Sequence, residues 1–117
     1  MISVQRAQEV VKTIFAELEV PFVPPPIYVS TELNKMYAGA YYDHPDGDFI
    51  IIRPEYFSDR TIAHELGHVL HHLFKVTDCH GGDPECERTA SMVERWWVNR
   101  QKQLGLLTED WKAGKEW

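Results

Sequence analysis

Two histidines and a glutamate stand at a spacing that suits metal-assisted hydrolysis. The segment reads His64-Glu65-Leu66-Gly67-His68, and histidines four residues apart on a helix lie one turn apart on the same face. Both imidazoles can therefore reach one ion. Glu65 lies at the neighbouring edge of that face, where it can take a proton from a water that zinc has made acidic. The pattern predicts that His64 and His68 bind zinc and that Glu65 is the catalytic base.

The context of the motif matters, because the same string arises by chance in roughly two chains in a hundred of this composition. A helix is predicted over residues 59–74, with Ser58 or Asp59 as its cap, since apolar residues recur there at helical steps. These are Ile62, Leu66, Val69 and Leu73. The two histidines avoid this stripe. Gly67 costs about 1 kcal/mol in a helix interior, so we expect a packing or access reason for it.

A catalytic zinc site needs a third protein ligand and an open position for water. The next predicted helix starts at Asp83-Pro84, a strong start signal, and ends or breaks at Gly105. Glu87 follows the second histidine by nineteen residues, which is enough for a loop and a return onto the first helix. The helix offers three carboxylates as candidates: Glu85, Glu87 and Glu94.

The motif with a downstream glutamate on a second helix resembles the gluzincin metallopeptidases. Residues 61–70 (TIAHELGHVL) resemble the ImmA/IrrE-like family and the minigluzincins within that group, and the resemblance covers about residues 38–98. Their third ligand begins a Glu-x-x-Ala pattern, which here runs from Glu87 to Ala90. The resemblance implies that Glu87 is the third ligand. Glu94 lies two turns beyond Glu87 on the same face, so it is the second choice of ligand, and we expect it instead to orient a zinc-bound histidine. The sequence departs from the pattern at Ser91, where an acidic or amide group is common.

The rest of the chain predicts an α+β fold in one domain, residues 1–117. An amphipathic N-terminal helix ends at Pro21, and short strands are expected at residues 27–29, 39–42 and 49–52. A short helix is expected at residues 108–111. The apolar stripe of the first helix consists of Val4, Ala7, Val11, Ile14 and Leu18.

Several other side chains are candidates for supporting roles. The oxyanion formed during hydrolysis needs a stabilising group besides zinc, and the sequence offers Tyr41, Tyr42, His80 and Arg60. Tyr41 and Tyr42 point to opposite faces of a strand, so at most one of them faces the site. His72 continues the line of histidines one turn further, and we expect it to bond to the loop or sheet. His71 is expected at the surface.

The two cysteines lie at the ends of the segment between the motif helix and the next helix. We expect Cys79 and Cys86 to be reduced and unpaired, as is usual for cytosolic proteins. Two alternatives stand beside this expectation. In one, Cys79 or His80 blocks the open zinc position. In the other, the two cysteines form a small disulfide.

Charge and composition exclude several other classes of protein. The chain carries a net charge of −6, whereas nucleic-acid binding needs a basic face. No segment approaches the roughly 20 apolar residues that cross a bilayer, and no apolar run near the N-terminus precedes a cleavage site. We therefore expect a cytoplasmic protein without nucleic-acid or membrane partners.

The predicted function is that of a zinc-dependent endopeptidase acting on a peptide or protein. Strand 49–52 is expected to be the edge on which an extended peptide is laid. One alternative is a zinc-binding regulatory or interaction module with little turnover, because the family resemblance implies action on transcriptional repressors. The other is a structural zinc site, which has no use for a base such as Glu65 and prefers four protein ligands. The sequence specifies neither the substrate nor the oligomeric state.

Overall fold

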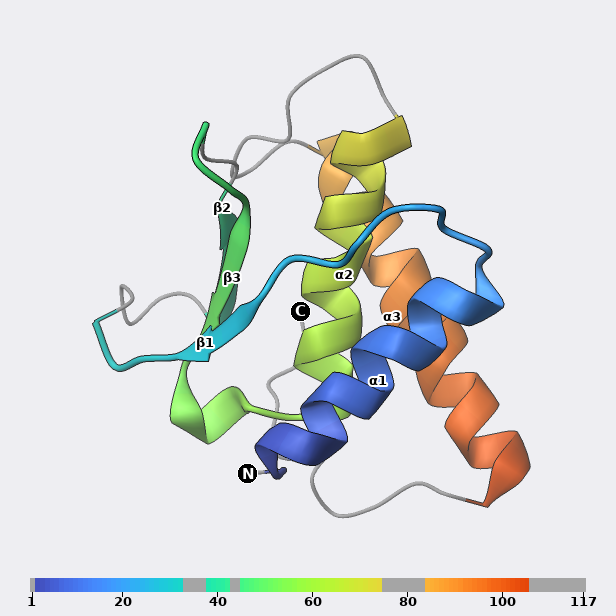
Figure 1. Cartoon of the computed structure of the whole chain (residues 1–117). Coiled ribbons are helices and arrows are strands. Elements are labelled where there is room, and N and C mark those ends of the chain that lie inside the picture. Colours follow the sequence, from blue (N-terminus) through green and yellow to red (C-terminus); the bar gives the residue numbers. More distant parts are fainter. Residues whose placement is uncertain (1, 33–37, 43–44, 75–83, 106–117) are drawn as a thin grey trace.

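Helices and a small sheet make up the described part of the chain, which comprises residues 2–32, 38–42, 45–74 and 84–105 of a computed structural model (Figure 1). The central element is α2 (Asp59–Phe74), which contacts α1 (Val4–Glu17), α3 (Pro84–Leu104) and the sheet. The predicted α+β class is confirmed, with its elements in the expected order. The short helix predicted at residues 108–111 lies outside the described residues.

Helix α1 begins where Ser3 caps it, because the Ser3 side chain accepts a hydrogen bond of 3.0 Å from the backbone N–H of Arg6. Its buried face is shifted from the predicted stripe. Val4 is 64% exposed and Leu18 39% exposed, because they lie at the two ends of the helix, beyond the core. The residues that pack inward are Ala7, Val10, Val11, Ile14 and Phe15.

The three predicted strands form one mixed sheet with the order β1-β3-β2. Strand β1 (Ile27–Val29) pairs in parallel with β3 (Phe49–Ile52), and β2 (Gly39–Tyr42) pairs with β3 antiparallel. Ile50 and Ile52 of β3 are fully buried against the helices. The expectation that residues 49–52 form an edge is wrong, because a nearly continuous apolar run suits a strand with a neighbour on each side. Among the described residues, β1 and β2 are the edges of the sheet.

The sequence-predicted limits of α2 agree with the structure. A 3-10 turn, η1 (Pro54–Tyr56), leads from the sheet to the helix. Ser58 is the cap, since its hydroxyl accepts from the backbone N–H of Thr61 at 3.3 Å. The apolar stripe turns toward α1 and the sheet, with Ile62, Leu66 and Val69 buried and Leu73 partly buried. This stripe fixes which face of α2 remains for the histidines.

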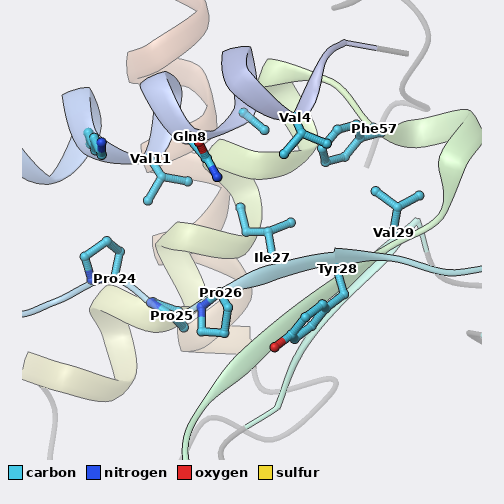
Figure 2. A pocket seen from close by; sticks show the side chains of 12 residues that line it. Val4, Gln8, Val11, Pro24, Pro25, Pro26, Ile27, Tyr28, Val29 and Phe57 are labelled. Carbon is cyan, nitrogen blue, oxygen red and sulfur yellow. The ribbon is translucent and has the colours of Figure 1, made fainter.

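A cavity of about 560 Å³ lies between α1 and the segment that runs through Pro24, Pro25 and Pro26 into β1 (Figure 2). Val4, Val11, Ile27 and Phe57 contribute to its apolar wall. No residue of the histidine motif lines this cavity. The cavity is thus separate from the histidine motif.

Within the described residues, none of the helices combines the length and the apolar character that spanning a bilayer requires.

Candidate metal centre

The contact between α2 and α3 positions the candidate site. A Cβ built on Gly67 would lie 2.4 Å from the Cα of Ala90, well inside any real contact. The missing side chain lets the two helix backbones touch, which is the packing reason expected for this glycine. The pairs His64–Glu94 and His68–Cys86 show that the helices run antiparallel. This arrangement brings the first turns of α3 opposite the motif.

The carboxylate of Glu87 lies between the Nε2 atoms of His64 and His68. One carboxylate oxygen of Glu87 lies 3.3 Å from Nε2 of His64, and the other lies 3.1 Å from Nε2 of His68. In a tetrahedral site with zinc–ligand bonds of about 2.0–2.1 Å, neighbouring ligand atoms lie about 3.3–3.4 Å apart. The two observed separations are close to this value, and each is to a different oxygen of Glu87. The donor set of two imidazoles and one carboxylate also occurs in catalytic zinc sites.

Glu85 and Glu94, the other predicted candidates, lie elsewhere. Glu85 is exposed, and its carbonyl accepts from the Thr89 hydroxyl within α3. Glu94 is buried two turns beyond Glu87, and its carboxylate lies 2.9 Å from Nδ1 of His64 while it also accepts from Arg60. A carboxylate accepts hydrogen bonds, so His64 carries a hydrogen on Nδ1. Glu94 thus holds the ring of His64 from behind, as the sequence predicts for a supporting residue.

His68 is held from behind by a different group. Its Nδ1 lies 2.9 Å from the sulfur of Cys86, which is fully buried at the start of α3. Cys86 is disulfide-bonded. The expectation of an unpaired Cys86 thiol is therefore wrong, and Cys79 and His80 lie outside the described residues. One feature of the sequence points to the contact between His68 and Cys86. Cys86 directly precedes Glu87, the residue that the sequence predicts as the third ligand.

Glu65 is buried beside the two histidines. It is 3% exposed, and burial raises the pKa of its carboxyl to about 7, against the opposing effect of His64. One donor atom from each of His64, Glu65 and His68 lies within 4.8 Å of the others. A Cβ at Gly39 would lie 3.3 Å from the Cγ of Glu65, so β2 passes directly along this carboxylate. A carboxyl that titrates near neutral pH can both take and give a proton.

The two imidazoles differ in their electrostatics. Burial lowers the pKa of His64, but the hydrogen bond to Glu94 and the charges of Glu65 and Glu87 outweigh burial and raise it overall. Burial lowers the pKa of His68 to about 4, although the charge of Glu87 opposes this. The neutral form of His68 therefore prevails at neutral pH, and neutral imidazole is the form that binds metal.

The candidates for oxyanion stabilisation lie in different places. The hydroxyl of Tyr41 donates to Asp48, and its ring meets that of His72 with centroids 5.9 Å apart, so Tyr41 faces α2. Tyr42 turns to the other face of the sheet and stacks on Phe49. The two tyrosines therefore point to opposite faces, as the sequence predicts. Arg60 pairs with Glu94.

His72 and His71 occupy different surroundings. His72 contacts the sheet through Tyr41, by a ring contact. The expectation that His71 lies at the surface is wrong, since it is 2% exposed and its Nδ1 lies 3.1 Å from the Thr89 hydroxyl. A signal in the sequence could have indicated this burial. Arg60, His64, Gly67 and His71 follow one another at steps of four, three and four, so they lie on one face of the helix, and α3 covers that face.

Comparison of the chain with protein-family models, with curated proteins and with solved structures finds no match. The chemistry of the site must therefore be argued from its own geometry. That geometry brings together His64, Glu65, His68 and Glu87, all named from the sequence, and adds the supporting contacts of Glu94 and Cys86.

Proposed function

We propose that the protein is a zinc-dependent endopeptidase in which His64, His68 and Glu87 hold the ion and Glu65 acts as the catalytic base. The observation that supports it most is the position of the Glu87 carboxylate, within 3.3 Å of Nε2 of both histidines. Each carboxylate oxygen of Glu87 faces the Nε2 atom of one of the two histidines, and Glu65 is buried alongside. The resemblance to the gluzincins, and to the ImmA/IrrE-like family and the minigluzincins, agrees with this proposal.

The protein groups divide the work between binding and proton transfer. Bound zinc would supply a Lewis acid that acidifies water and polarises a carbonyl. Glu65 takes the proton of the attacking water and later gives it to the departing amine, which a carboxyl with a pKa of about 7 can do in both directions. Glu94 and Arg60 keep the ring of His64 in place throughout.

The substrate peptide is proposed to lie along β2. This strand is an edge of the sheet and runs past Glu65 at Gly39. The backbone N–H of Arg53 donates to Ala38, so the antiparallel alternation turns the backbone groups of Gly39 away from β3. An extended peptide can add there as a strand beside the site. This assignment replaces residues 49–52, which are enclosed between two strands.

The proposed compartment is the cytoplasm, and the proposed partner is a peptide or protein. Stable disulfides are uncommon in the cytoplasm, where those that occur are usually transient, catalytic or redox-sensing. In the cytoplasm, a disulfide at Cys86 would therefore be one that is reversibly formed and reduced. The acidic chain offers nucleic acid no overall attraction.

The test compares zinc content and casein cleavage in the wild type and in Glu65→Gln, which keeps the shape of the side chain. If both proteins bind one equivalent of zinc and only the wild type cleaves, the peptidase proposal stands. Zinc binding by both without any cleavage would favour the regulatory module instead. A wild type that takes up no zinc would overturn the proposal entirely.

A further inference from the structure

We propose that the cavity between α1 and β1 binds an extended, apolar segment of another protein, which adds to the outer edge of β1 as a strand. This is the cavity of about 560 Å³ described above, and none of its lining residues belongs to the metal centre. The inference goes beyond the proposed peptidase function and does not depend on zinc. It gives the protein a second surface for extended peptides, besides the one proposed along β2.

The outer edge of β1 carries backbone groups that face away from the sheet. The carbonyl of Pro26 accepts a hydrogen bond from β3, and the N–H of Ser30 donates one to β3. Every second residue of a strand bonds to the same neighbour, so Tyr28 also faces β3, whereas the backbone groups of Ile27 and Val29 turn outward. Among the described residues, β1 has no second neighbouring strand. The outward N–H and C=O groups can therefore pair with an added strand.

The cavity lies along this edge of β1. Ile27, Tyr28 and Val29 all line it, although neighbouring side chains of a strand point to opposite faces of the sheet. Figure 2 shows Ile27 on the side of α1 and Tyr28 pointing away from α1. A cavity that meets side chains of both faces lies at the edge of the strand rather than against one face.

The opposite wall limits the cavity to a single strand. It is formed by α1, where Val4, Gln8 and Lys12 line the cavity at steps of four residues. These residues span about 12 Å along the helix axis, which is the length of about four residues of a strand. The β1 edge of a second copy of this chain is itself flanked by α1. An extended segment without a folded domain around it therefore suits the cavity better than a second copy does.

The side chains around the cavity determine the chemistry of the segment. Val4 is 64% exposed, Tyr28 55% and Val29 40%, so a bound segment would cover apolar surface. Every second side chain of an added strand points toward α1, and we expect these side chains to be apolar. Among the described residues that line the cavity, Lys12 is the only charged one, in a chain with a net charge of −6. An acidic side chain on the segment would complement Lys12.

The position of Lys12 determines where the acidic side chain lies. Lys12 follows Val11, which lies near Pro24 in Figure 2, whereas Val4 lies nearer to Val29. Antiparallel pairing is slightly more stable per residue than parallel pairing. A segment antiparallel to β1 has its C-terminal end near Pro24. We therefore expect the acidic residue at the C-terminal end of the segment.

The experiment uses a fluorescent hexapeptide in which valine alternates with threonine and aspartate is the C-terminal residue. Fluorescence anisotropy measures its binding to Glu65→Gln, the host protein, which lacks the proposed catalytic base. Two further peptides carry N-methyl groups at alternate residues, one set for each edge of the strand. We expect only one of these two peptides to bind more weakly, by about tenfold, because it alone loses the donors that face β1. Equal effects of the two sets would overturn the inference, because a merely apolar pocket does not distinguish the edges.

Val29→Pro, made in the host protein, tests whether the peptide binds at β1. The N–H of Val29 faces away from β3, so proline removes an outward donor and leaves the pairing with β3 intact. Val29→Thr keeps the N–H and the branched shape and is the matched control. We expect about fivefold weaker binding by Val29→Pro only, with circular dichroism as the check on folding. Unchanged binding by a folded Val29→Pro would place the peptide elsewhere, as along β2, and would overturn the inference. The N-methylated peptides decide the matter if this variant does not fold.

Lys12→Gln, also in the host protein, tests the charge. It should bind the aspartate peptide about two- to fivefold more weakly and a peptide with asparagine in its place unchanged. Equal binding of both peptides by the host would overturn the acidic part of the inference. Sedimentation velocity that shows a dimer, dissociated by Val29→Pro, would assign the edge to a second copy and overturn the inference. Peptide binding that persists in chelator while no form of the protein takes up zinc would overturn the peptidase proposal alone.

Discussion

Gly67 and Ala90 bring the backbones of α2 and α3 into contact, with only 2.4 Å between the Cα of Ala90 and the place where a Cβ on Gly67 would lie. The contact sits between His64 and His68 on one helix and Glu87 and Glu94 on the other. The separation of the two helices thus determines whether carboxylates and imidazoles meet.

We expect Gly67→Ala to destabilise the protein and to weaken zinc binding. The added methyl group meets backbone, which cannot move aside without separating the helices. The expected loss of unfolding free energy is about 1–3 kcal/mol, even though alanine favours helix by about 1 kcal/mol over glycine. Chemical denaturation and zinc titration measure both effects. Met92→Ala, at an exposed position on α3, should change neither. Unchanged stability and affinity in Gly67→Ala would contradict the packing role.

Glu87→Ala should abolish most zinc binding. The variant removes the carboxylate that lies within 3.3 Å of both Nε2 atoms, and we expect an affinity loss of roughly 100-fold or more. Isothermal titration calorimetry measures it. Glu85→Ala, two residues earlier at an exposed position, is the matched control and should bind as the wild type does. Equal affinity in the two variants would remove Glu87 from the ligand set.

Glu94→Gln should weaken zinc binding without removing a ligand. The amide loses the charge that holds His64 and Arg60, so we expect about a 10- to 100-fold loss of affinity. Glu17→Gln is the control, because Glu17 also pairs with an arginine, Arg100, but at the surface. A loss confined to Glu94→Gln supports the orienting role. Similar small effects in both variants would argue against it.

The stability of the zinc-free protein should depend on pH through Glu65. Burial raises the pKa of Glu65 from 4.5 to about 7, so the folded state holds this proton more tightly than the unfolded state. Its stabilising contribution is complete below about pH 4.5 and is lost as the pH rises through about 7. The wild type should therefore lose roughly 3 kcal/mol relative to Glu65→Gln across this range.

The difference between the two proteins is the quantity to measure. His68 acts in the opposite sense, because its pKa is lowered to about 4 and its contribution is lost as the pH falls from about 6.5 to 4. In the wild type, the changes of unfolding free energy with pH that Glu65 and His68 cause partly cancel. Urea denaturation of both proteins in chelator isolates Glu65. A difference that stays constant from pH 4 to pH 8 would contradict a buried, titrating Glu65.

Local patterns in the sequence predict much of the fold, because each depends on neighbours within a few residues. The limits of α2, the start of α3 at Pro84 and the three strands all follow from periodicity and from start signals. The order of the strands does not, since pairing joins residues far apart in the chain. The central position of β3 was therefore predicted wrongly.

The residues of the candidate site also fall into two groups: those that local spacing in the sequence identifies and those whose contacts depend on the packing of the helices. His64, Glu65 and His68 are adjacent along one helix, so their spacing already identifies them. Glu87 was selected by its spacing from His68 together with the family resemblance, and Glu94 by its position two turns further on the same face. The burial of His71 and the contact between His68 and Cys86 depend on how closely α3 approaches α2. Sequence periodicity does not specify that distance.

The apolar stripe of α2 also determines the direction in which the two histidines project. Each residue of a helix is turned by about 100° from the one before. Ile62, Leu66 and Val69 lock α2 against α1 and the sheet, so they also set the angle at which His64 and His68 project toward α3. One residue inserted between Ser58 and Ile62 would leave either the stripe or the N-terminal turn of α2 out of register. The packing of the hydrophobic core therefore determines the direction in which the histidines of the candidate centre point.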